Sequence, residues 1–114
     1  MTRSKLIHVS LRVAEDVSRL RRRDAYRAIR KAMQVVLGRA DFRIVHASIQ
    51  ANHVHLLVEA SDKVALARGL QAFQISAAKW LNKAELGHTG RARRGPAFPD
   101  RYHARFRSRR RRAG

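Results

Sequence analysis

The spacing of hydrophobic positions predicts a strand near the N-terminus and a helix after it. Residues 5–13, KLIHVSLRV, alternate an apolar set with a more polar set, which is typical of a strand with one better-buried face. In residues 19–37 the apolar period lengthens to three and four residues, and arginines and lysines occupy most other positions. The apolar stripe of this segment consists of Ile29, Met33, Val36 and Leu37. We therefore expect an amphipathic helix that ends at Gly38.

Two more strands and a second helix are predicted in the middle of the chain. Residues 42–50 and 53–60 are rich in strand-forming side chains and are joined at Ala51-Asn52, so they are expected to form a hairpin. Asp62 can cap a following helix that ends at Leu86-Gly87. Its apolar stripe is Leu66, Leu70, Phe73, Ala77, Trp80 or Leu81, and Ala84. We interpret the whole stripe as core packing, although aromatic side chains can also stack on bases.

The character of the sequence changes after Gly87. The last part contains both prolines and many arginines, and its apolar residues are scarce. Phe98 and the segment RYHARF, residues 101–106, could form one last short strand. We expect residues 1–106 to form one domain and residues 107–114, RSRRRRAG, to be a basic disordered tail.

The predicted order of elements is β-α-β-β-α-β. This order is typical of the α+β class, and within it of the ferredoxin-like split βαβ sandwich. In that architecture both helices cover one face of an antiparallel sheet. The opposite face of the sheet is then free to bind a partner.

Composition indicates the kind of partner. The 114 residues carry 26 Lys+Arg against 8 Asp+Glu, a formal charge of +18, and such self-repulsion favours a polyanion as the partner. Nucleic acid is the leading interpretation; an arginine-rich genome composition or an anionic membrane surface are the alternatives. The chain has no cysteine, which excludes a disulfide framework, a thiolate metal site and a cysteine nucleophile.

The N-terminal sequence gives no sign of export. Its apolar run is short and is interrupted by His8, Ser10 and Arg12, so it lacks the hydrophobic region of a signal peptide, and no other stretch could span a bilayer. We expect a cytoplasmic protein with no membrane partner.

Two histidines stand at the start of the most hydrophobic strand, in QANHVHLLVEA. On a strand, residues two apart project to the same face, so His53 and His55 are expected to lie side by side. Two neutral imidazoles can share one divalent ion and leave coordination positions open for phosphoryl chemistry. A packed or hydrogen-bonded pair is the usual outcome of the bare spacing, so the motif alone leaves both readings open.

Longer stretches resemble a known family, the single-tyrosine HUH transposases of bacterial insertion sequences, which include the REP-associated tyrosine transposases. The resemblance covers roughly residues 6–106 and rests on HVSLRV, FRIVHASIQANHVHLLVEA, ALARGLQAFQISAAKWLNKA and GPAFPDRYHARF, in that order. It implies the ferredoxin-like fold and makes His53 and His55 the ligands of Mg²⁺ or Mn²⁺. It further implies that the metal polarises a phosphate of single-stranded DNA and that a tyrosine attacks, leaving a 5′-phosphotyrosine and a free 3′-OH.

The C-terminus departs from the pattern of that family. By the resemblance, the nucleophilic tyrosine would lie about seventeen residues beyond Tyr102, on a helix that also supplies a further polar metal ligand. The tyrosines of this chain are Tyr26, in the first predicted helix, and Tyr102, which matches the motif tyrosine of RYHAR and not the nucleophile. We therefore expect a C-terminally truncated member, in which Tyr102 is the remaining candidate and enzymatic activity is uncertain.

Basic side chains are expected to contact DNA phosphates. The candidates are Lys79, Lys83, Arg91, Arg93, Arg94, Arg101 and Arg105. Glu59, on the face of the two histidines, could complete a metal shell, or it could be a solvated carboxylate at the end of a strand.

Three functional hypotheses follow from the sequence. The chain is a transposase-like protein that binds single-stranded or hairpin DNA, a non-catalytic DNA-binding remnant of one, or a ferredoxin-like RNA-binding protein whose histidines are incidental. A homodimer is possible.

Overall fold

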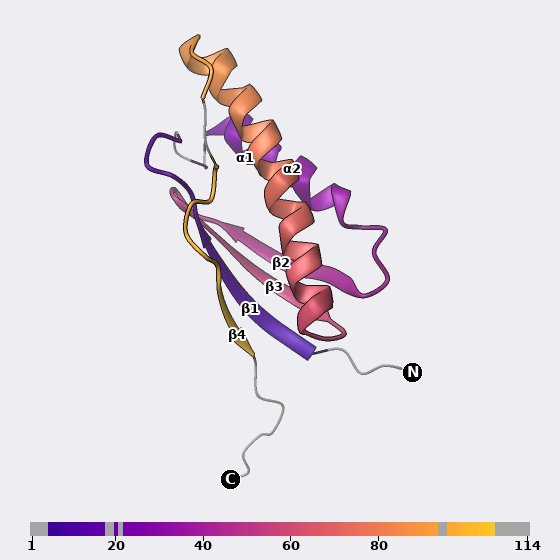
Figure 1. The fold of residues 1–114 in the computed structure, drawn as a ribbon. Coiled ribbons are helices and arrows are strands. Elements are labelled where there is room, and N and C mark those ends of the chain that lie inside the picture. The colour runs from indigo at the N-terminus through magenta and orange to yellow at the C-terminus, as the bar shows by residue number, and fades with distance from the viewer. Residues whose placement is uncertain (1–4, 18–19, 21, 94–95, 107–114) are drawn as a thin grey trace.

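The computed structural model describes residues 5–17, 20, 22–93 and 96–106; the predicted tail, residues 107–114, lies outside this part of the chain. The elements, in chain order, are β1 (Lys5–Arg12), α1 (Arg23–Val35), β2 (Phe42–Ile49), β3 (His53–Ala60), α2 (Lys63–Thr89) and β4 (His103–Phe106) (Figure 1). Their order is the predicted one.

The strands form one antiparallel sheet in the order β2-β3-β1-β4. The two central strands, β1 and β3, are joined through the long connection that contains α1 and β2, which is the split βαβ arrangement. Figure 1 shows α1 and α2 together on one side of this sheet. The predicted α+β sandwich is confirmed, and we call the sheet face away from the helices the open face.

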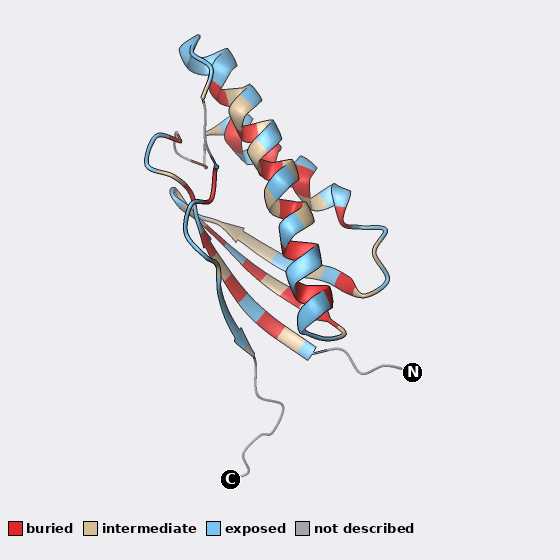
Figure 2. Ribbon diagram, in the orientation of Figure 1, coloured by how far each residue is buried: buried red, intermediate tan, exposed pale blue. Residues whose placement is uncertain are grey.

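The core lies between the sheet and the helices. Ile7, Val9 and Leu11 of β1 are buried and alternate with exposed or half-buried neighbours, and β3 shows the same alternation (Figure 2). This period of two confirms that each central strand turns its apolar side chains toward the helices.

The structure corrects the ends of both predicted helices. Leu37, expected on the buried stripe, is 74% exposed, because α1 ends at Val35 and the helical period no longer sets the direction of later side chains. In α2, Asp62 caps the N-terminus as predicted and accepts a hydrogen bond from Ala65 N–H at 2.8 Å. Gly87 does not end this helix, which runs on to Thr89 and stops at Gly90, whose φ of 76° favours glycine.

Helix α2 packs closely on the start of β2 through Gly69. A Cβ atom at this position would overlap the ring of the buried Phe42. We expect Gly69→Ala to lower the free energy of unfolding by about 1–3 kcal/mol, although alanine raises helix propensity by about 1 kcal/mol. Urea unfolding at constant m-value measures this change.

Gly87→Ala provides the matched control, because a Cβ atom at Gly87 meets nothing within 4 Å. The same substitution in the same helix should there raise stability by about 0.5–1 kcal/mol. Equal effects of the two alanines would show that the contact between Gly69 and Phe42 does not limit the packing of α2.

Candidate functional site

The two histidines of the HVH motif lie side by side on the open face of β3. Val54, between them, is fully buried on the helix side. The rings of His53 and His55 are nearly parallel, with an interplanar angle of 10° and 5.9 Å between centroids. The predicted common orientation of the two side chains is therefore present in the structure.

Each ring is held through its Nδ1 atom. His53 Nδ1 donates to Asn52 Oδ1 at 2.7 Å, and His55 Nδ1 shares a hydrogen bond of 2.9 Å with the Ser10 hydroxyl. Within the described residues neither Nε2 atom has a hydrogen-bond partner. Metal-binding histidines commonly have one nitrogen fixed in this way while the other is the ligand, so the pair fits a divalent ion as two imidazole ligands.

The described residues add no third protein ligand to this pair. No group of three or more His, Asp or Glu side chains among them could hold a metal ion. Glu59, considered as a further ligand, instead forms an ion pair with Arg43 of β2 at 2.6 Å. An ion bound by His53 and His55 would therefore keep most of its coordination positions for solvent or substrate oxygens.

A pocket of about 510 Å³ adjoins the pair on the β1–β4 side of the open face. It is lined by His8, Val9, Ser10, His55, His103, Ala104 and Arg105. Strand register brings these residues together from distant parts of the sequence, because Ser10 is paired with both His55 and His103, and His8 is paired with Arg105. The pocket therefore combines imidazole, hydroxyl and guanidinium groups, all of which can donate hydrogen bonds to an anion.

All histidines of the chain except His88 lie on the open face. His46 also belongs to it, since it is paired with Leu57 on the same side of the sheet. Glu59 is the only acidic residue in the four strands. The HVH pair was predicted from its spacing, but the convergence of the other histidines on this face was not. The one sequence signal for it is the polar position of His8 in the alternating first strand.

The seven basic residues proposed from the sequence do not form one surface. Arg105 lines the open-face pocket and Arg101 is exposed just before β4. Lys79 and Lys83 are exposed on α2, in the layer on the other side of the sheet, and Arg91 follows the end of that helix. Arg94 lies outside the described residues.

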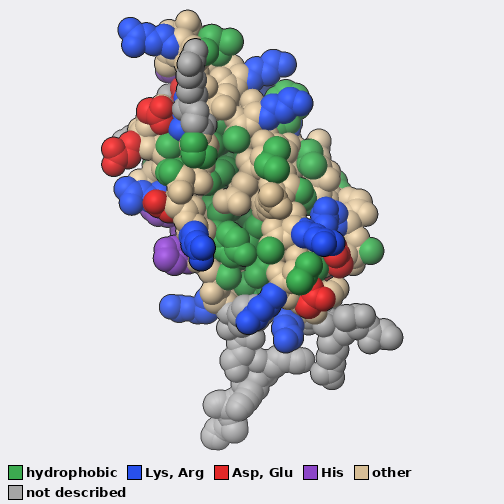
Figure 3. Space-filling view, viewed as in Figure 1, with side chains coloured by type: hydrophobic (Ala, Val, Ile, Leu, Met, Phe, Trp, Pro, Cys, Tyr) green, Lys and Arg blue, Asp and Glu red, His purple; other side chains and the backbone are tan. Residues whose placement is uncertain are grey.

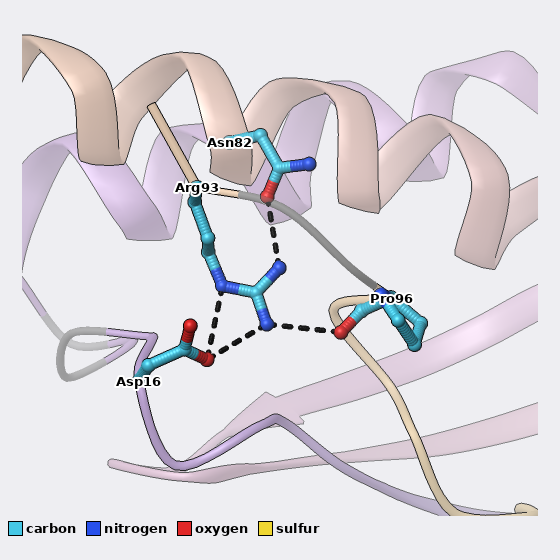
Figure 4. A network of polar contacts seen from close by, with 4 residues as sticks. All are labelled: Asp16, Asn82, Arg93 and Pro96. Carbon is cyan, nitrogen blue, oxygen red and sulfur yellow. Dashed lines mark hydrogen bonds and ion pairs between the residues drawn. The ribbon is translucent and has the colours of Figure 1, made fainter. Parts of the chain in front are cut away.

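Arg93 is placed inside the fold and not on a binding surface. Its side chain is only 5% exposed, and its guanidinium contacts three separate segments (Figure 4). It bonds Asp16 Oδ1 through Nε at 3.2 Å and Nη2 at 2.8 Å, Asn82 Oδ1 at 3.1 Å and the Pro96 carbonyl at 2.9 Å. These contacts join the loop after β1, helix α2 and the segment that leads to β4, so the position of Arg93 indicates a structural role.

Neither tyrosine lines the open-face pocket. Tyr102 is half-buried and packs against the hydrophobic core, whereas its neighbour His103 lines the open-face pocket. Tyr26 belongs to α1 in the helix layer. Neither side chain is thus directed to the open face of the sheet.

Comparisons with known proteins agree on one group. The family model described as "Transposase IS200 like" matches residues 3–111. The fold is similar to the crystal structure of a protein from Deinococcus radiodurans R1 that has been assigned as a transposase, with a TM-score of 0.70 and 14% identity over 96% of this chain and 83% of the other. A search of curated proteins finds no match. No helix in the described part of the chain is long and apolar enough to cross a membrane.

Proposed function

The chain belongs to the IS200-like transposase family, and from this premise we propose that it binds single-stranded or hairpin DNA across the open face of its sheet. We further propose that His53 and His55 hold a divalent ion, Mg²⁺ or Mn²⁺, at this face. Membership of a transposase family implies a DNA partner, and the charge of +18 is consistent with one.

The observation that carries this proposal is the shared location of the histidine pair and the basic pocket. His55 belongs to both, so a phosphate held in the pocket would lie beside the ligands of the ion. Arg105 would supply a fork of donors to phosphate oxygens, and Ser10 would keep the His55 ring in place. A divalent ion bound there would withdraw charge from a phosphodiester.

The positions of the two tyrosines favour a DNA-binding role for the described residues over covalent cleavage of DNA by one of these tyrosines. In the reaction that the family resemblance implies, a tyrosine hydroxyl attacks the phosphate, so its phenol must reach the phosphate next to the metal ion. Tyr102 faces the core and Tyr26 lies on the helix layer. We assign ion binding and DNA binding to the described residues and no covalent step to Tyr102.

We expect the double variant His103→Ala, Arg105→Ala to bind labelled single-stranded DNA about tenfold more weakly, because it removes two donors from the pocket. Each phosphate that is no longer neutralised should reduce the slope of log K against log salt by about 0.7 for a single strand. Fluorescence anisotropy over a salt series measures both quantities. Unchanged affinity and slope in this variant would contradict binding at the open face.

Tyr102→Phe serves as the neighbouring control in this experiment. The substitution changes a residue next to β4 that does not line the pocket, so the affinity for DNA should equal that of the unmodified chain. With Mn²⁺ and labelled hairpin DNA, a denaturation-resistant adduct that disappears in Tyr102→Phe would overturn our assignment and make this tyrosine the nucleophile.

A further inference from the structure

A small pocket lies between the end of α1 and the start of β2. Its volume is about 230 Å³. We call it the α1–β2 pocket; it is lined by Arg30, Met33, Gln34, Val36, Leu37, Arg43 and Ile44. Hydrophobic side chains make up most of this lining, and the pocket shares no residue with the open-face pocket. The two pockets therefore differ both in place and in chemistry.

The residues around the α1–β2 pocket expose apolar side chains that the core does not bury. Leu37, in the lining, is 74% exposed, and Val35 and Val45 on the adjoining elements are 55% and 47% exposed. Single exposed apolar residues are common on protein surfaces, but several beside one pocket are typical of a site that binds another protein. The segment 35–45 thus offers apolar area to a partner.

Helix α1 carries a row of exposed arginines that leads to this pocket. Arg23, Arg27 and Arg30 follow one another at intervals of four and three residues, so they lie on one face of the helix. None of the ion pairs among the described residues involves these three, since Asp24, the one acid of α1, pairs with Arg22. Figure 3 shows the helix-bearing side of the molecule, on which lysine and arginine side chains are distributed widely and acidic ones are few. Like charges at these helical spacings repel one another, so a negatively charged partner would relieve the repulsion.

We propose that the α1–β2 pocket and this arginine row together bind an acidic segment of another protein. One apolar side chain of the segment enters the pocket, and its carboxylates lie along the arginine row. Arginine suits this role because its planar guanidinium can donate two hydrogen bonds to one carboxylate. The site uses neither the two histidines nor the open-face pocket, so the proposal does not depend on the function proposed above.

Arg30 is the residue that joins the two parts of the site. It is exposed, it lines the pocket and it is the last member of the arginine row. Arg43 also lines the pocket, but its guanidinium is paired with Glu59 at 2.6 Å. The charge available beside the pocket is therefore that of Arg30.

The lining favours a peptide over other occupants. A nucleic-acid backbone supplies negative charge but no aliphatic side chain that would cover Leu37 and Met33. The volume of about 230 Å³ is smaller than the roughly 300–1,000 Å³ of small-molecule sites, so it suits a single side chain. A second copy of this chain would bring its own charge of +18, and it complements the arginine row less well than an acidic segment does.

The test uses two labelled peptides, an oligo-aspartate that ends in phenylalanine and the same oligo-aspartate that ends in serine, both with an amidated C-terminus. Leu37→Ser changes the exposed lining of the pocket, and Ile75→Ser, at a 63% exposed position of α2, is its control. Arg30→Gln changes the arginine row, and Arg68→Gln, also exposed on α2, is its control. Circular dichroism first establishes that all four variants are folded, and fluorescence anisotropy measures the affinities.

We expect the unmodified chain to bind the phenylalanine peptide about tenfold more tightly than the serine peptide, because burial of the ring adds to the attraction between charges. Leu37→Ser should remove this preference, and Ile75→Ser should keep it. Arg30→Gln should weaken the binding of both peptides by about threefold relative to Arg68→Gln, since each exposed ion pair contributes little.

Equal binding of the two peptides by the unmodified chain would overturn the proposal, and so would equal effects of Leu37→Ser and Ile75→Ser. The same variants reveal two other occupants. Leu37→Ser would weaken binding of an oligothymidylate as much as that of the phenylalanine peptide if the pocket belonged to a nucleic-acid surface. In analytical ultracentrifugation, a dimer that Leu37→Ser dissociates would show that a second copy of the chain fills the pocket. Either result would exclude the acidic segment as the occupant.

Discussion

Replacing His53 and His55 together by alanine should weaken Mn²⁺ binding by more than about 100-fold. The structure offers two imidazole Nε2 atoms and no third protein ligand among the described residues, so the double variant removes every protein ligand that we propose. Loss of an outer-shell partner alone typically costs 10- to 100-fold in metal affinity, and loss of the ligands themselves should cost more. Isothermal titration calorimetry at constant pH measures the change.

The matched control removes two imidazoles from other places. His46→Ala, His88→Ala changes one open-face histidine on β2 and one on α2, and it should bind Mn²⁺ as the unmodified chain does. Ser10→Ala, which keeps both ligands but frees Nδ1 of His55, should weaken binding by about tenfold. Equal Mn²⁺ affinity in the His53, His55 double variant and the unmodified chain would end the metal proposal.

Arg93→Ala should lower the free energy of unfolding by about 2–3 kcal/mol. The guanidinium is almost fully buried and bonds Asp16, Asn82 and the Pro96 carbonyl at once, and removing such a group leaves partners without their donors. The cost stays below that of a fully buried pair because Asp16 is 66% exposed and regains water. Urea unfolding measures the change.

The variant Arg93→Lys distinguishes the contribution of the positive charge from that of the planar guanidinium group. Arg93→Lys keeps the charge but not the planar fork, so it should recover less than half of the stability that the alanine removes. Arg68→Ala, at an exposed position of α2, should stay within about 0.5 kcal/mol of the unmodified chain. If Arg93→Ala behaved like Arg68→Ala, the network in Figure 4 would contribute nothing to folding.

The fold could be predicted from local patterns, because hydrophobic residues repeat every two positions in the strands and every three or four positions in the helices. Alternation in residues 5–13 and 53–60 placed the two central strands, and the cap at Asp62 placed the start of α2. The end of α2 was mispredicted because two glycines lie near it, and only the backbone conformation shows that Gly90 and not Gly87 takes the left-handed region.

The site was predictable only where its residues are neighbours in sequence. The spacing of His53 and His55 placed them on one face, but no local pattern connects His103 with Ser10, which meet through the pairing of β4 with β1. Arg93 illustrates the opposite case, since an arginine in a basic segment was expected at the surface. Its burial depends on Asp16 and Asn82, which are distant in sequence.

The pairing of β1 with β4 also determines the order in which the open face can be assembled. The hairpin of β2 and β3 joins adjacent segments, whereas Ser10 and His103 meet only by closing a loop that contains most of the chain, at a greater cost in chain entropy. Contacts of high sequence separation generally slow folding. On a ribosome, His53 and His55 emerge well before Arg105, so a nascent chain contains the two histidines that we propose as ion ligands before it has synthesised the strand that completes the open-face pocket.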